Sequence, residues 1–168
     1  MQEKLRRHYQ IQKEVSRGSN FQGKIGLGDL NRLADFLLLD RADIEVEFKF
    51  SRSDYDLSMV EGEIQTRLTI KCQRCLRAME IPLKINFQLL VSPPDSEVIE
   101  SGLDTVYSQN GSVDIFEVVE DELILGLPLV TMHEDIACNE YWQTQAEDPE
   151  QATKENPFSV LAKLKTTH

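Results

Sequence analysis

The sequence predicts an α+β fold, in which a curled antiparallel β-sheet, barrel-like or a meander, is joined by two or three helices and an acidic flexible segment. Three consecutive runs alternate apolar and polar side chains with a period of two, which is typical of strands with one face on a core. Short turns separate these runs, so neighbouring strands are expected to pair antiparallel. The apolar spacing then becomes helical, which places helices against the sheet.

The alternating runs cover residues 44–50, 64–70 and 81–91. Burial of about four large side chains per strand contributes roughly 6–12 kcal/mol per strand before entropy is subtracted. Residues typical of turns occur at 53–56 and at 61–62. The motif Cys72-Gln73-Arg74-Cys75 lies between the second and third runs, so it is predicted to form a hairpin.

Helical spacing follows two capping residues. Asp29 is predicted to cap one helix, and Asp114 precedes a second that ends at Gly126 and Pro128. A short strand is expected before the first of them, at 21–27. The apolar residues of the first predicted helix are Leu30, Leu33, Ala34, Leu37 and Leu38.

The domain organisation follows from composition. Residues 1–20 are polar and basic and are predicted to form an N-terminal arm. The α+β core is placed at 21–133, with an acidic loop at 92–112. An acidic linker at 134–155 follows, and Asn-Pro opens a short C-terminal helix at 156–168.

Charge is distributed unevenly along the 168 residues, whose net charge is −11. Residues 1–91 hold 15 Lys/Arg and 13 Asp/Glu, a net of +2, whereas residues 92–168 hold 3 and 16, a net of −13. The chain has three cysteines, a charged N-terminus and no run of about 20 apolar residues. We therefore expect a cytoplasmic protein with no membrane partner and with reduced or metal-bound thiols.

The two cysteines of the hairpin allow three interpretations. Cys72 and Cys75 have the spacing of half a zinc site, for which His133 and Cys138 are the candidate second half. Alternatively they are reduced, half-buried turn residues. A thiol-redox pair is the third interpretation, but such a site needs a helix after the first cysteine, and here both flanks are predicted strands.

Other catalytic signals are weak, since the sequence has neither a glycine-rich phosphate loop nor a paired His-x-x-x-His. The acidic run at 117–122 is interpreted as a solvated helix face. The sequence therefore predicts no enzymatic activity, no small-molecule substrate and no cofactor other than the zinc considered above.

Basic residues around the hairpin indicate contact with nucleic acid. Lys71, Arg74 and Arg77 flank the cysteines, and Arg6 and Arg7 lie in the N-terminal arm. Such side chains bind phosphates without reading sequence. These five residues are the candidate RNA-binding set. Acidic residues 92–155 are expected either to face away from RNA or to act as an internal mimic of the nucleic acid.

Four blocks of the chain resemble the YceD family, the large ribosomal RNA subunit accumulation proteins. They are Cys72–Cys75 with the strand that follows, 113–130, 133–138 and 156–165. The resemblance implies a cytoplasmic bacterial protein needed for accumulation of 23S rRNA, with no established enzymatic activity. Some relatives carry a second Cys-x-x-Cys where this chain has only His133 and Cys138.

Composition and resemblance together predict a non-catalytic ribosome biogenesis factor. It is expected to promote synthesis, processing or accumulation of 23S rRNA by binding precursor rRNA or an assembling large subunit. Basic ribosomal proteins or assembly factors are further candidate partners. The alternatives are a protein–protein adaptor that uses the acidic half, and a small zinc-stabilised or thiol-redox protein that uses Cys72 and Cys75.

Overall fold

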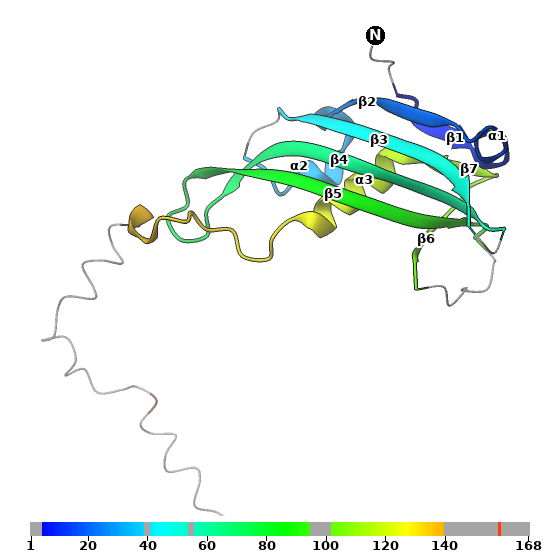
Figure 1. The fold of residues 1–168 in the computed structure, drawn as a ribbon. Helices are drawn as coiled ribbons and strands as arrows, with labels where there is room; N and C mark the ends of the chain where they lie inside the picture. Colours follow the sequence, from blue (N-terminus) through cyan, green and yellow to red (C-terminus); the bar gives the residue numbers. More distant parts are fainter. Residues whose placement is uncertain (1–4, 39–40, 54–55, 95–101, 140–157, 159–168) are drawn as a thin grey trace, which may run out of the picture. The chain divides into compact units, whose positions relative to one another are not determined.

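The computed structural model describes residues 5–38, 41–53, 56–94, 102–139 and 158 (Figure 1). The chain divides into two compact units, Met1–Met132 and His133–His168. In the second unit the described residues include a short 3-10 helix, η2, at Ile136–Cys138. The predicted helix at 156–168, apart from Phe158, and most of the predicted linker at 134–155 lie outside the described residues.

A five-stranded sheet forms the centre of the first unit and confirms the predicted α+β class. Four strands pair antiparallel in sequence order, and the last pairs parallel with its neighbour, so the sheet is mostly antiparallel and does not close into a barrel. The strands are β2 (Asn20–Gly26), β3 (Asp43–Arg52), β4 (Ser58–Lys71), β5 (Ala78–Ser92) and β6 (Asp104–Tyr107).

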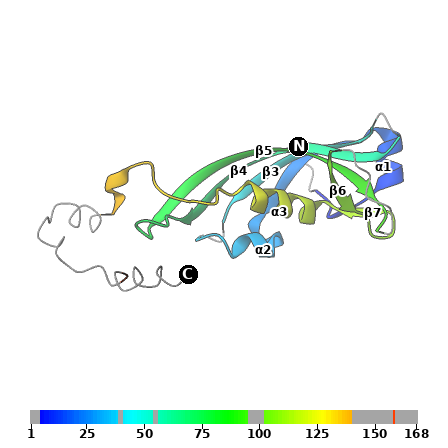
Figure 2. The ribbon, with the colours of Figure 1, turned by 90° about the horizontal axis from the view of Figure 1, so that it is seen from below.

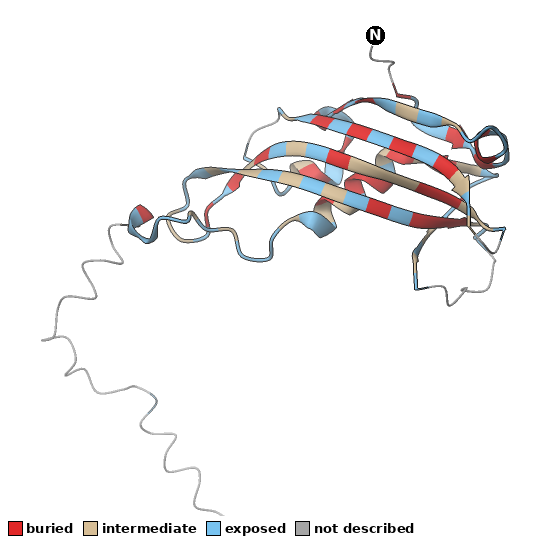
Figure 3. Cartoon of the chain, in the orientation of Figure 1, coloured by how far each residue is buried: buried red, intermediate tan, exposed pale blue. Residues whose placement is uncertain are grey.

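The predicted period of two appears directly as alternating burial along β3 (Figure 3). Ile44, Val46, Phe48 and Phe50 are buried, while the charged residues between them face solvent. Ion pairs between neighbouring strands, such as Lys84 with Glu63 at 3.0 Å, cover the solvent face. Alternation therefore predicts the register as well as the strands, because a slip of one residue would expose the core face.

Gly62 lies inside β4, so the turn predicted at 61–62 is wrong. It pairs with Phe48 on one side and Phe87 on the other. A Cβ atom at this position would lie 2.3 Å from the Glu47 carbonyl oxygen and 2.8 Å from atoms of both phenylalanines. Glycine is present because the Glu47 carbonyl and the side chains of Phe48 and Phe87 occupy the space that a Cβ atom would need, a reason that no turn motif reveals.

Helix α3 (Ile115–Gly126) lies against one face of the sheet, beside the short helix α2 (Asn31–Ala34) (Figure 2). The Asp114 side chain accepts hydrogen bonds from the amides of Phe116 (3.0 Å) and Glu117 (3.2 Å), so this predicted helix start is confirmed. No helix in the described part of the chain is long and apolar enough to cross a membrane.

Helix α2 is one turn long, shorter than the predicted helix, and Asp29 does not cap it. Asp29 instead ends the 3-10 helix η1 (Leu27–Asp29). The start of α2 is held by Glu120 of α3, whose carboxylate accepts from the amides of Arg32 (2.6 Å) and Leu33 (3.1 Å). Glu120 is buried, so the predicted solvated acidic face does not include it. This tertiary cap defines where α2 begins.

Residues 5–20 are folded into the core, which differs from the predicted basic arm. They form β1 (His8–Gln10) and α1 (Ile11–Arg17). The apolar residues scattered among the cations cause this, since Tyr9 packs on Phe21 with ring centroids 4.6 Å apart. The buried side chains of this segment include Leu5, Tyr9, Ile11 and Val15.

The predicted acidic loop at 92–112 also carries structure. It contains β6, and β7 (Ser112–Asp114) begins at its end and pairs antiparallel with β1. Val106 of β6 packs against the core, which explains why an otherwise polar segment forms an edge strand. Residues 95–101 lie outside the described part of the chain.

Candidate metal centre and basic hairpin

The β4–β5 hairpin presents the Cys-x-x-Cys motif. Lys71 and Ala78 form the last pair of the ladder. Beyond it, the Cys72 amide donates to the Arg77 carbonyl and the Leu76 amide donates to the Cys72 carbonyl, each at 2.9 Å. Leu76 has a φ of 61°, a left-handed conformation that is uncommon for a side chain of this size. The turn therefore folds back tightly on itself just after Cys75.

The segment that follows α3 runs along this hairpin. The Gln73 amide donates to the Thr131 carbonyl at 2.7 Å, and the Thr131 hydroxyl donates to the Lys71 carbonyl at 2.9 Å. The Gln73 side-chain amide reaches the Leu129 carbonyl at 3.4 Å. These bonds lie within the first unit, and His133 follows Thr131 by two residues.

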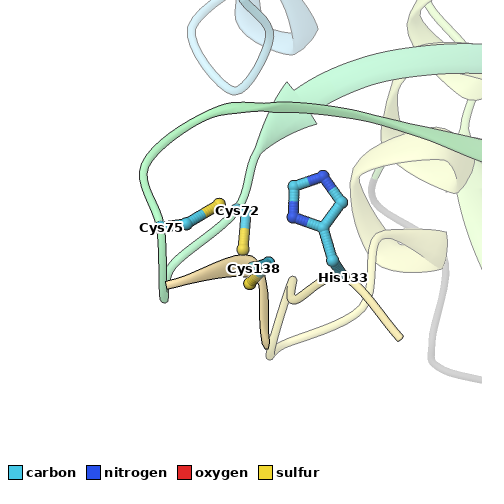
Figure 4. Close-up of side chains that lie close together, drawn as sticks. All are labelled: Cys72, Cys75, His133 and Cys138. Carbon is cyan, nitrogen blue, oxygen red and sulfur yellow. The ribbon is translucent and has the colours of Figure 1, made fainter. Parts of the chain in front are cut away.

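Four potential metal ligands come together at this position (Figure 4). The ligand atoms of Cys72, Cys75, His133 and Cys138 all lie within 4.8 Å of one another. Cys72 and Cys138 are buried, whereas Cys75 and His133 are half-buried. The structure thus brings together all four residues that the sequence singled out for a metal. Three thiols and an imidazole form a donor set suited to zinc.

The cysteine of the second half is positioned by η2. The Asp135 carboxylate accepts from the Ala137 amide at 2.8 Å, and the Cys138 amide donates to the Asp135 carbonyl at 3.2 Å. An aspartate that caps a single helical turn in this way fixes the local backbone. One turn of 3-10 helix therefore shortens the distance that the four residues between His133 and Cys138 would otherwise span.

The predicted RNA-binding cations separate into two groups. Lys71 and Arg77 are exposed on the hairpin, and Arg74 is half-buried between the two cysteines. Arg6 and Arg7 directly precede β1 in the sequence, and β1 and α1 lie at the opposite end of the sheet from the β4–β5 turn (Figure 1). One compact patch of all five residues is not formed.

Arg6 and Arg7 make intramolecular contacts. Arg7 pairs with Asp114 at 2.7 Å, and this hydrogen bond raises the pKa of the Arg7 guanidinium. Arg6 lies 4.8 Å from the centre of the Tyr9 ring and 3.5 Å from a carboxylate oxygen of Glu14. Both side chains therefore help to hold the N-terminal segment on the core.

An apolar groove of about 580 Å³ lies beside the hairpin, within the first unit. Phe36, Leu76 and Leu129 line it and are 53%, 63% and 96% exposed. Large apolar side chains gathered at such exposure mark an interaction surface more often than a neutral one. Sequence reasoning missed the groove because its lining comes from three separate segments.

Comparison with known proteins places the chain in a family. The model of the family described as "Large ribosomal RNA subunit accumulation protein YceD" matches residues 60–165. The chain belongs to the YceD family. A curated relative from Haemophilus influenzae, named large ribosomal RNA subunit accumulation protein YceD, is 33% identical over 161 residues, which cover 91% of each chain. No solved structure matches the chain.

The YceD match contains every residue of the candidate metal centre and all three hairpin cations. Arg6 and Arg7 lie before it. The part of the chain that the family model covers is thus the part that carries the hairpin, α3 and the segment after α3.

Proposed function

We propose that this YceD protein acts without catalysis in the accumulation of large-subunit ribosomal RNA, the 23S rRNA of a bacterial cytoplasm. The observation that carries the proposal is the family match over residues 60–165, supported by a relative of that name along nearly the whole chain. The working surface of the proposal is the β4–β5 hairpin, through which the chain contacts precursor rRNA or an assembling large subunit.

Two features support the hairpin as the contact with RNA. Lys71 and Arg77 are exposed at the end of the two longest strands, which carry these charges away from the centre of the sheet. Both residues also lie within the part of the chain that the family model matches, residues 60–165. Exposed cations on a protruding turn contact phosphates at little cost in desolvation.

Affinity for fragments of precursor 23S rRNA, measured across a salt series with the full chain, tests this contact. The double variant Lys71→Ala/Arg77→Ala should bind more weakly and lower the slope of log affinity against log salt by about two. Lys49→Ala/Lys84→Ala is the matched control, since it removes the same charge from the solvent face of the sheet. Equal losses in both variants would contradict a hairpin-specific contact.

A second candidate function is that of an adaptor for an assembly protein or a basic ribosomal protein. The apolar groove beside the hairpin favours it, because an apolar segment of a partner would cover Phe36, Leu76 and Leu129. Recovery of large-subunit precursors from cells separates the two functions when nuclease is added. An adaptor retains its protein partner after nuclease and loses it in Leu129→Ser. The control Leu125→Ser alters an exposed side chain outside the groove.

A further inference from the structure

We propose that the outer edge of β5 binds an extended segment of a partner protein, which adds to the sheet as a further strand. The slot for this segment is residues 83–88, between Pro82 and the point where β6 begins to pair (Figure 1). The proposal goes beyond the contact with RNA and beyond the apolar groove. The slot contains none of the hairpin cations and none of the residues that line the groove.

The backbone groups of β5 face β4 and the outer edge in alternation. Pro82 lies opposite Arg67 within an unbroken antiparallel ladder. Because proline has no N–H, it is tolerated inside a strand only where its nitrogen faces away from the neighbouring strand. Ser92, an even number of residues further along, has its carbonyl on the β6 side, where it accepts from the Ser108 amide at 2.8 Å. Both observations place the N–H and C=O groups of the even-numbered residues of β5 at its outer edge.

Lys84, Asn86 and Gln88 therefore present their backbone groups at this edge. β6 pairs with β5 only beyond Gln88, and no described residue hydrogen-bonds to the outer backbone of residues 83–88. The chain bends at Gly102, which has a φ of 73°, just before β6, so β6 does not continue along the slot. A strand is usually about five or six residues long, so the slot has room for one.

The core face of the slot is incomplete on its outer side. Leu83 and Ile85 are half-buried, whereas Ile64 of β4, which pairs with Ile85, is fully buried. At the other edge of the sheet, Ile25 of β2 is only 1% exposed. Among the described residues, the apolar face of the sheet is thus covered at β2 and open at β5. A further strand beside β5 would cover Leu83 and Ile85.

The exposed groups of the slot define the chemistry of the partner. Unpaired N–H and C=O groups at strand spacing pair with an extended backbone and not with a helix. Alternating side chains on that backbone would place apolar residues beside Leu83 and Ile85 and polar residues in solvent. Pro82 limits the length of the added strand, since it offers no donor, and a proline at an edge also disfavours edge-to-edge association of copies of the chain. The partner therefore supplies a short extended segment with alternating apolar residues.

Amide hydrogen exchange of the full chain, followed by NMR, tests the slot in the free protein. The amides of Lys84, Asn86 and Gln88 should exchange fast, and those of Ile85 and Phe87 should exchange slowly because they bond to β4. Protection of the first three at every protein concentration would show that the chain itself covers the edge, and would overturn the proposal. Protection that increases with protein concentration would assign the slot to a second copy, and would overturn it as well.

A synthetic peptide of alternating valine and threonine, with terminal lysines for solubility, is the probe for the occupant. Its addition should slow exchange at Lys84, Asn86 and Gln88. The same peptide N-methylated at every second residue, on the edge that would pair with β5, should not bind. Equal binding of the methylated peptide would overturn the proposal, because a strand cannot then be what the slot recognises.

Asn86→Pro tests the same contact from the side of the protein. It removes one outward N–H and should weaken binding of the valine–threonine peptide by roughly tenfold. The Tm should stay unchanged, since proline is tolerated where the N–H faces away from the neighbouring strand. Asn86→Ala is the matched control, because it removes the same side chain and keeps the N–H. Equal affinity of the two variants would contradict strand addition, and a lower Tm for Asn86→Pro alone would show that this N–H faces β4.

Discussion

The two ends of the sheet are held together by different interactions. At the end near β1 and α1, four aromatic rings pack with centroids 4.6–6.2 Å apart. Arg6 lies over one of these rings, and Arg7 pairs with Asp114. At the hairpin end, backbone hydrogen bonds connect Gln73 with Thr131, and the apolar side chains around them are exposed. The side chains at the first end are buried in a core, whereas those at the hairpin end are exposed and available to a ligand.

The difference in exposure between the two ends indicates that a binding function is to be expected at the hairpin end. Burial of the aromatic end makes it stable and leaves little surface for a partner. The hairpin end combines exposed cations, an apolar groove and the two potential metal ligands Cys72 and Cys75. Exposed apolar side chains beside exposed charges are typical of a binding surface.

The largest expected effect comes from removal of an aromatic side chain at the closed end. Phe48→Ala should lower the free energy of unfolding by about 3–5 kcal/mol, because it empties a fully buried site among three other rings. Leu129→Ala, at the open end, should change it by less than about 0.5 kcal/mol. Urea unfolding measures both. Comparable losses would mean that the open end is buried in solution.

The next effect tests the close packing in the middle of the sheet. Gly62→Ala should cost about 1–3 kcal/mol, since the added methyl group meets the Glu47 carbonyl, the Cβ atom of Phe48 and the ring of Phe87. The double variant Gly62→Ala/Phe87→Leu should recover part of this loss by making room. Thermal unfolding in matched buffer gives the comparison. An unchanged Tm for the single variant would show that the strands are further apart than described.

At the open end, the opposite substitution should stabilise. Leu76→Gly removes the Cβ atom that opposes a φ of 61° and should raise the free energy of unfolding by about 0.5–1 kcal/mol. Leu76→Ala is the control, because it shortens the side chain and retains the strain. Equilibrium denaturation compares the two variants. A gain in both would assign the effect to the exposed side chain instead of the backbone.

The smallest effect concerns pH and lies on α3, between the two ends. Burial raises the pKa of Glu122 above its ordinary value of 4.5, with Asp104 and Asp121 adding to the shift. The folded state therefore binds the carboxyl proton of Glu122 more tightly than the unfolded state does. The stability that protonation contributes is present below pH 4.5 and is lost as the pH rises through the raised pKa of the folded state.

Glu122→Gln keeps a neutral side chain at all pH values and should stabilise the protein at pH 7, by less than about 0.5 kcal/mol because the group is only half-buried and solvent screens its charge. The gain should disappear at pH 4. Denaturation of wild type and variant at the two pH values checks this. A gain of the same size at both would point to packing instead of charge.

Much of the fold was predictable from residue patterns. The strands, their antiparallel order and the hairpin at Cys72–Cys75 follow from alternation, and the start of α3 follows from Asp114. Three elements were not predictable. The start of α2 depends on Glu120, 88 residues away from Arg32. The N-terminal segment folds because an aromatic core is available to Tyr9, and β6 forms because β5 offers it an edge.

The candidate site shows the same division. Cys-x-x-Cys in a hairpin is a local pattern, so the first half of the metal centre was predictable with its spacing. His133 and Cys138 were candidates by residue type alone, and no periodicity connects them to the hairpin. The groove had no sequence signal, since exposure of Phe36 and Leu129 depends on neighbours that are distant in the chain.

The sequence by itself determined the alternation that selects strands, the knuckle spacing of Cys72 and Cys75, and the membership of the YceD family. These depend on local periodicity and on residue identity, which survive without knowledge of the fold. Only the tertiary structure decided that β1 and α1, beside Arg6 and Arg7, lie away from the hairpin, that Gly62 makes room for the Glu47 carbonyl and the Phe87 ring, and that four potential metal ligands lie close together. The physical reason is that burial and proximity are properties of pairs of segments. The free energy that brings two segments together depends on the contacts between them, which neither segment specifies by itself.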